Sequence, residues 1–205
     1  MLRVNLIIAA TSLMVTPALA QSIRLGPVLQ EHSPDHMWVM WETTSNTPSI
    51  IEYGTSPALG QSVMGASGAS QGGARIHHTR ISNLDPDTVY YYRVGSGGAM
   101  SDVLTFRTPQ RTEDEGAFRF AALSDTQGGP ISDMHTQTIN DGIIKFVQEN
   151  FGPNLHDELD FVIQPGDLVS TGSDYQQWKD QYFDETQNLY QHVPIYPVPG
   201  NHEQD

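Results

Sequence analysis

Three short apolar runs in the second half of the chain each end in a cluster of polar residues. The candidate ligands are Asp125 and Gln127 after the first run, Asp167 after the second, and Asn201 and His202 after the third. If the runs are parallel strands of an α/β sheet, their carboxyl ends meet at one edge, where such sheets bind ligands. Carboxylate and amide oxygens with one histidine beside them suit hard or borderline divalent cations such as Mn²⁺, Fe or Zn²⁺. The pattern therefore predicts a metal site at that edge.

The elements that must position these residues alternate between strands and helices. The sequence predicts strands at residues 118–123, 160–164 and 194–199, and helices at 137–151 and 174–190. The first helix is predicted from an apolar face made of Ile139, Ile143, Phe146, Val147 and Phe151. The second is predicted from Tyr175, Trp178 and Tyr182, which share one helical face. Alternating strands and helices indicate an α/β layer architecture.

Residues 22–108 have a different sequence pattern, in which short runs rich in Val, Ile, Thr, Tyr and Trp are separated by Pro, Gly, Ser and Asn. Short strands at regular spacing with turn residues between them indicate an all-β sandwich. The Gly/Ala/Ser-rich residues 60–74 are interpreted as a mobile loop of this sandwich. Residues 109–117 are polar and without pattern, and they are interpreted as the linker to the α/β region.

The run from Leu84 to Tyr90 resembles the tyrosine corner of fibronectin type III domains, with a generic proline turn as the alternative. In such a corner a tyrosine hydroxyl is hydrogen-bonded to the backbone a few residues upstream. Strand alternation then predicts that Tyr90, Tyr92 and Val94 face the core. His77 and His78 lie in the preceding strand-like run and are interpreted as ordinary strand histidines rather than metal ligands.

The polar clusters resemble a known family when they are taken in order. The trio is Asp125-x-Gln127, then Gly166-Asp167, then Gly200-Asn201-His202-Glu203. Each motif alone is common, but the ordered trio after three apolar strands resembles the calcineurin-like metallophosphoesterase superfamily. A fibronectin-like domain in front of it is similar to the purple acid phosphatase architecture. The expected fold is therefore a fibronectin type III-like sandwich over 22–108, followed over 118–205 by the N-terminal half of an α/β metallophosphoesterase domain.

The resemblance implies a role for each candidate residue. Asp125 and Gln127 would bind the first metal ion, Asp167 would bridge both ions, and Asn201 would bind the second. His202 would be the catalytic residue that contacts the phosphate or protonates the leaving oxygen. Two metal ions (Fe, Zn or Mn) about 3.5–4 Å apart would clamp the reacting phosphate, and a metal-bound hydroxide would attack it. The implied substrate is a small-molecule phosphate ester.

Two positions depart from the purple acid phosphatase pattern. The purple enzymes carry a tyrosine three residues after the bridging aspartate, where this chain has Ser170. They have glycine at the position of Gln127, where colourless relatives usually have histidine. An iron–tyrosinate colour is therefore not expected, and the chain resembles the wider metallophosphoesterase family more than the purple branch.

The family's later histidine motifs lie downstream of Gly-Asn-His-Glu, and this sequence ends three residues after His202. We therefore expect the sequence to be an N-terminal fragment of a longer protein, with little or no activity by itself.

Composition excludes several classes of function. Ten Lys+Arg against 24 Asp+Glu give a formal net charge of −14. This balance argues against nucleic-acid binding, which needs clustered basic residues. The absence of cysteine excludes disulfide frameworks, thiolate zinc sites and cysteine nucleophiles. A second hypothesis is a secreted binding or adhesion protein with a degenerate phosphoesterase scaffold. The intact set of Asp125, Asp167, Asn201 and His202 favours the enzyme.

Residues 1–20 predict a secretory signal peptide with cleavage after Ala20. Arg3 precedes a short apolar stretch that ends in Ala18-Leu19-Ala20, which is the order expected of such a signal. The alternative is a membrane anchor, but Thr16 and Pro17 interrupt a stretch that is already short for a bilayer. No later segment has the ~18 apolar residues of a membrane span. We therefore expect a secreted or periplasmic protein.

Overall fold

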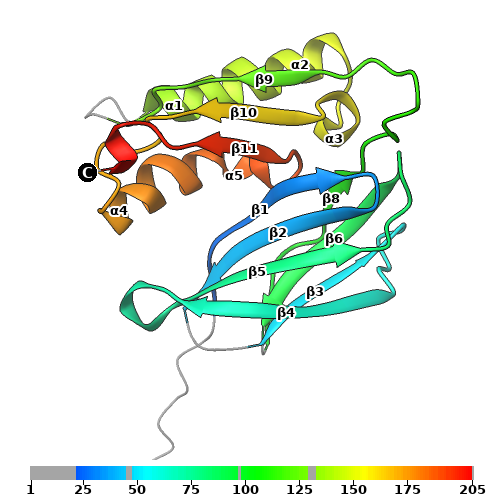
Figure 1. Ribbon diagram of the computed structural model, residues 1–205, viewed down its shortest axis with the longest axis horizontal. Helices are drawn as coiled ribbons and strands as arrows, with labels where there is room; N and C mark the ends of the chain where they lie inside the picture. The colour runs from blue at the N-terminus through cyan, green and yellow to red at the C-terminus, as the bar shows by residue number, and fades with distance from the viewer. Residues whose placement is uncertain (1–21, 45–47, 97, 129–132, 205) are drawn as a thin grey trace, which may run out of the picture.

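The computed structural model describes residues 22–44, 48–96, 98–128 and 133–204 (Figure 1). The predicted signal peptide lies outside these residues. Within them, no helix is long and apolar enough to cross a membrane.

The N-terminal part is a β-sandwich, as expected. Its strands are β1 (Ile23–Ser33), β2 (His36–Thr43), β3 (Ser49–Gly54), β4 (Gln61–Ala69), β5 (Arg75–Ser82), β6 (Val89–Ser96), β7 (Ala99–Met100) and β8 (Leu104–Arg107). One layer runs β1-β2-β5-β4, and the other contains β3 and β6 with β7 and β8. Strand β4 also pairs with β3, so the two layers are joined at that side. Trp41, Tyr92 and Phe106 are fully buried between the layers.

The predicted tyrosine corner is confirmed. The backbone N–H of Asp85 donates a hydrogen bond to Tyr90 Oη at 2.9 Å. Tyr90, Tyr92 and Val94 are buried, as the alternation along β6 predicts. The bond fixes the chain where it enters β6, so the local motif and the strand register support each other.

The interpretation of residues 60–74 as a mobile loop is wrong. Residues 61–69 form β4, followed by the short helix η1 (Gln71–Gly73). Close packing requires a small residue at one position, because a Cβ on Gly65 would lie 1.9 Å from Thr79 Oγ1 of β5, whereas a Cβ on Gly68 would meet no atom within 4 Å. Composition alone therefore suggested a loop where the chain forms a strand that pairs with β3 and β5.

The C-terminal part alternates between strands and helices. Its elements are β9 (Phe120–Ala122), α1 (Asp133–Gln137), η2 (Thr138–Ile144), α2 (Lys145–Asn150), α3 (Leu155–Glu158), β10 (Phe161–Pro165), α4 (Tyr175–Gln177), η3 (Trp178–Phe183), α5 (Asp184–Tyr190), β11 (Ile195–Val198) and η4 (His202–Gln204). Strand β10 pairs in parallel with β9 on one side and β11 on the other. The segments η2 and η3 are stretches of π-helix that continue α1 into α2 and α4 into α5. The expected α/β layer is present.

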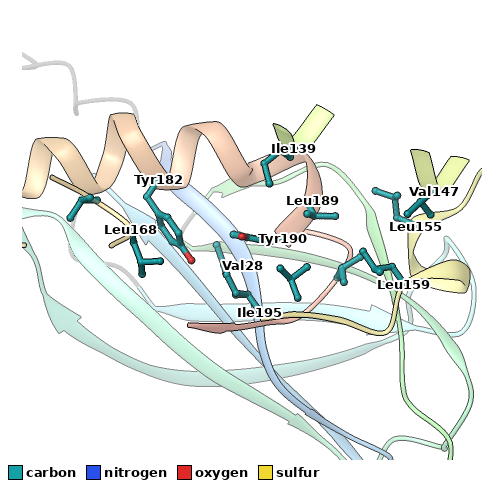
Figure 2. Packing of buried hydrophobic residues seen from close by; sticks show 13 residues of the cluster. Val28, Ile139, Val147, Leu155, Leu159, Leu168, Tyr182, Leu189, Tyr190 and Ile195 are labelled. Atoms are coloured by element: carbon teal, nitrogen blue, oxygen red, sulfur yellow. The ribbon is translucent and has the colours of Figure 1, made fainter. Parts of the chain in front are cut away.

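The helices pack on one face of this sheet (Figure 1). Their buried side chains meet those of the strands in one core, which Val28 of β1 also enters (Figure 2). Ile139 and Val147 belong to this core, whereas Phe146 and Phe151 are 57% and 46% exposed. The expectation that these two phenylalanines share the buried face is wrong. Phe146 is one residue, or about 100°, away from Val147 around the helix, and Phe151 follows the end of α2.

The opposite face of the sheet carries exposed aromatic rings. Val162 points into the helix-covered core, so its neighbour Phe161 points the other way. Phe161 stacks on Phe120 with their ring centroids 5.4 Å apart, and Phe118 stacks against both. Phe118 and Phe120 are 65% and 51% exposed.

The sandwich and the α/β part share one hydrogen-bonded sheet. Strand β1 pairs in parallel with β11, with Gln30 opposite Ile195. Tyr92 Oη donates to the carbonyl oxygen of Gln191 at 2.7 Å, which ties the sandwich core to the end of α5. A further ion pair joins Arg107 to Asp157. These contacts hold the sandwich against the edge of the α/β sheet.

The junction also contains His32, whose Nδ1 lies 2.8 Å from Tyr196 Oη. Burial lowers the pKa of His32 from 6.5 to about 4, although Asp160 raises it and His36 lowers it further. Burial likewise lowers the pKa values of His156 and His192 at the same junction. The folded state therefore keeps these rings neutral at a pH where the unfolded chain binds protons.

We predict that the free energy of unfolding falls as the pH falls from 6.5 towards 4, because the unfolded state then binds more protons than the folded state. His32→Gln removes one such group. It should make the slope shallower by at most about 1.4 kcal/mol per pH unit. Urea unfolding of the whole chain between pH 4 and 7.5 measures this slope. His78→Gln, at an exposed position, is the matched control. Equal slopes for the two variants would contradict the prediction.

Candidate metal centre

The parallel pairing of β9, β10 and β11 aligns the three loops that carry the candidate ligands. The N–H of Asp125 donates to the carbonyl oxygen of Gly166 at 3.4 Å, and that of Gln127 donates to the carbonyl oxygen of Asp167 at 3.1 Å. The N–H of His202 donates to Asp167 Oδ1 at 3.2 Å. These hydrogen bonds bring the first and third loops to the second. The assignment of Asp125, Gln127, Asp167 and Asn201 as metal ligands stays a prediction.

Both candidate carboxylates have an unusual backbone conformation. Asp125 and Asp167 lie in the left-handed region, with φ of 54° and 52°. Aspartate tolerates this region better than most residues, but the region is still less favourable for any residue with a side chain than for glycine. Such backbone outliers cluster at functional sites, because the surrounding structure must hold them in place. Asp125 lies three residues after the end of β9, and Asp167 lies two residues after the end of β10.

Glycines allow the second and third loops to approach closely. A Cβ on Gly200 would lie 2.2 Å from Asp167 Oδ1, and one on Gly166 would lie 2.9 Å from the Cα atom of Gly200. The positive φ of Gly166, 83°, also disfavours any larger residue there. A side chain on either glycine would therefore collide with the neighbouring loop.

The oxygen of the Gln127 side chain is compatible with a bound cation. Gln127 Oε1 is buried and has no hydrogen-bond partner in the part of the chain that the structure describes. An unsatisfied buried acceptor costs about 1–3 kcal/mol, which a cation at this position would offset. Among the described residues, no three His, Asp or Glu side chains lie close enough together to hold a metal ion. The candidate set instead combines carboxylate and amide oxygens, which suit a hard cation such as Mn²⁺.

His202 has a defined ring orientation. Its Nδ1 donates to the carbonyl oxygen of Ser170 at 2.8 Å, because a carbonyl only accepts. This bond sets the tautomer of a neutral ring, in which Nε2 is the nitrogen that can accept a proton. Ser170 is held in turn by Gln181, whose Oε1 accepts from the Ser170 N–H at 3.1 Å.

Two residues at the site had no role in the sequence analysis. Gln181 lies on η3, where helical spacing offers no indication that it supports a loop after β10. Glu203 accepts hydrogen bonds from the backbone N–H groups of Asp167, Leu168, Val169 and Gly200. Burial raises the pKa of Glu203, but these hydrogen bonds outweigh burial and hold the pKa below its usual value. Its place at the end of the Gly-Asn-His-Glu motif was the available sequence evidence.

The structure is an α/β part, with three strand-end loops hydrogen-bonded together at one sheet edge, and a β-sandwich in front of it. Comparison with known families supports the same division. Residues 23–108 match the family described as purple acid phosphatase, N-terminal domain, and residues 118–205 match calcineurin-like phosphoesterase. The chain belongs to the calcineurin-like phosphoesterases that carry a purple acid phosphatase N-terminal domain.

Curated relatives include several acid phosphatases. Purple acid phosphatase 18 of Arabidopsis thaliana is 45% identical over 31% of this chain and 16% of its own length. Purple acid phosphatase 21 of the same plant is 29% identical over 82% of this chain and 35% of its own length. Acid phosphatase type 7 of Danio rerio is 24% identical over 82% of this chain and 37% of its own length. The chain thus spans well under half the length of these relatives.

A solved structure with a similar fold is the one described as "Structure of PhoD". It aligns with 87% of this chain and 39% of its own chain, with a TM-score of 0.55 and 14% sequence identity. At this identity the likeness concerns the fold alone.

We predict that Gly200→Ala weakens Mn²⁺ binding about tenfold or more, because its Cβ would displace the Asp167 carboxylate. Isothermal titration of the whole chain with Mn²⁺ measures this change. Gly68→Ala is the matched control, since a Cβ there meets no atom within 4 Å and the backbone is not left-handed. Equal Mn²⁺ affinity in both variants would argue against this site.

Proposed function

We propose that this protein is an exported, binuclear metal-dependent phosphoesterase that hydrolyses small-molecule phosphate esters. The observation that carries the proposal is the hydrogen-bonded convergence of the three strand-end loops on Asp167. Asp167 accepts at its carbonyl oxygen from Gln127 and at Oδ1 from His202. One residue therefore links the first and third motifs, as expected of a carboxylate at the centre of the site. The family membership and the acid phosphatase relatives support the same reaction class.

Each candidate ligand would bind one or both of the two metal ions. Asp125 and Gln127 would hold one ion and Asn201 the other, with Asp167 shared by both. The bound metals would polarise the phosphate ester and make an attacking water more acidic. Gln127 Oε1 is buried and has no hydrogen-bond partner within the described ranges, which supports a cation on that side of Asp167. The oxygen-rich set favours Mn²⁺ over softer ions, and Fe and Zn²⁺ remain the alternatives.

His202 would handle the proton of the leaving group. The hydrogen bond from Nδ1 to Ser170 keeps a proton on that nitrogen, so Nε2 is the atom that exchanges a proton with the substrate. Ser170 occupies the position of the purple enzymes' tyrosine, and here its backbone carbonyl orients His202. A phenolate ligand is absent at this position, so the metal centre should be colourless.

We predict that Asp167→Ala removes more metal and more activity than Gln127→Ala. Asp167 would contact both ions with a charged group, whereas Gln127 would contact one through a neutral oxygen. Bound Mn²⁺ per chain and phosphate release from an aryl phosphate measure the two effects in the longest natural form of the protein. Asp102→Ala, an exposed acid outside the site, is the control. Equal or reversed effects would remove the bridging role from Asp167.

We predict that the exported protein begins at Gln21, because Ala18-Leu19-Ala20 ends the apolar stretch as a cleavage site does. Expression in a host with a secretory pathway, followed by intact-mass measurement of the exported fraction, checks this. Replacing Ala18 and Ala20 with bulky residues should block processing. A mass that retains residues 1–20 in the unmodified protein would contradict export by a cleaved signal.

A further inference from the structure

We propose that Glu203 is the positioning residue of the candidate metal centre: its carboxylate fastens the loop of Asp167 to the loop of Gly200 and Asn201. The inference rests on the proposed function of this site, and it adds a residue to which the ligand assignment gives no role. It is carried by hydrogen bonds that one side chain makes to two loops.

Both oxygens of the Glu203 carboxylate accept hydrogen bonds from backbone N–H groups. Its Oε1 accepts from the N–H groups of Leu168 at 2.7 Å and Val169 at 3.1 Å. Its Oε2 accepts from the N–H groups of Asp167 at 2.9 Å and Gly200 at 2.7 Å. Successive backbone N–H groups that point to one place form an anion-binding concavity. In this protein the anion is the side-chain carboxylate of Glu203.

The same contacts explain how Asp167 keeps its left-handed backbone. Its N–H is held by Glu203 and its carbonyl oxygen by the N–H of Gln127, so both neighbouring peptide groups are fixed. Glu203 is held in turn, because Gly172 packs against it so closely that a Cβ on Gly172 would lie 2.4 Å from the Glu203 carbonyl oxygen. Without the carboxylate, nothing else in these contacts holds the Asp167 N–H in place. The Asp167 carboxylate would then keep only the hydrogen bond from the His202 N–H to its Oδ1, and its orientation would be less restricted.

An ionised carboxylate is the side chain that fits these donors. It only accepts hydrogen bonds, with about four lone-pair directions. Glutamine is nearly the same shape, but its NH₂ group would face two backbone donors and leave them unsatisfied. Aspartate keeps the charge, yet it is one methylene shorter and reaches fewer of these N–H groups. Glu203→Gln therefore tests the acceptor role with little change in volume, and Glu203→Asp tests reach.

The experiment compares Glu203→Gln, Glu203→Asp and Glu203→Ala in the whole chain. Glu149→Gln, at an exposed position away from the site, is the matched control. Amide hydrogen exchange of Asp167, Leu168, Val169 and Gly200 without metal reports on the fastening itself. Mn²⁺ affinity from isothermal titration reports on its consequence, and the melting temperature reports on global stability.

We expect Glu203→Gln to speed hydrogen exchange at these amides at least tenfold. It should also weaken Mn²⁺ binding about 10- to 100-fold, which is the range seen when residues that orient metal ligands are changed. Glu203→Asp should recover part of both losses. The fall in Mn²⁺ affinity should exceed what the change in melting temperature accounts for. If Glu203→Ala fails to fold, the nearly isosteric glutamine variant still decides the question.

If Glu203→Gln has the same amide exchange rates and the same Mn²⁺ affinity as Glu149→Gln, the proposal is overturned. If the unmodified chain binds no Mn²⁺, the metal-site proposal fails. The exchange rates then still decide whether Glu203 fastens the two loops. Faster exchange with unchanged Mn²⁺ affinity would make Glu203 a purely structural residue, and would also overturn its role in positioning the ligands.

Discussion

The parallel pairing of β9, β10 and β11 is the constraint on which the site depends. Parallel strands end at the same edge, so loops that are far apart in the sequence become neighbours there. The loops that carry Asp125, Asp167 and Asn201 follow these three paired strands, so their proximity depends on the pairing rather than on a local motif. The loops are then tied by their own backbone groups, with Asp167 as the common partner. The sheet thus sets the approximate positions, and hydrogen bonds between the loops set the final ones.

The sandwich has a structural connection to this sheet. Its edge strand β1 pairs with β11, which satisfies backbone groups that an open edge would expose. Val28 of β1 enters the core beneath the helices, so the two parts share buried apolar surface as well as hydrogen bonds. On the helix side, Tyr175 donates a hydrogen bond to the buried Glu42 of β2. The loop that leads from β10 into α4 is therefore held at its far end by the sandwich.

Much of this architecture follows from patterns of short range in the sequence. The corner at Tyr90 and the alternation along β6 were predictable, because a turn motif and strand periodicity act locally. The exposure of Phe146 and the strand within residues 60–74 were not predictable. A helical period does not say which side of the helix meets the core, and composition does not show the neighbouring strand with which a segment pairs. Glu203 lies inside a predicted motif, but its role depends on where four backbone N–H groups point in the described structure. Such directions exist only after the chain has folded.

The chemistry of the site follows from how its groups are held rather than from their types alone. Asp and Gln after a strand are ordinary surface residues unless their orientation is restricted. Here Asp167 has fixed peptide groups on both sides, and His202 has one ring nitrogen engaged by Ser170. Gln127 has a buried oxygen that finds no partner among the residues that the structure describes. Each restriction removes a solvent-exposed alternative that would compete with binding a cation or a phosphate. Preorganised groups lose little freedom on binding, so restrained oxygen donors of this kind suit the proposed metal centre better than the same residues would on a free surface.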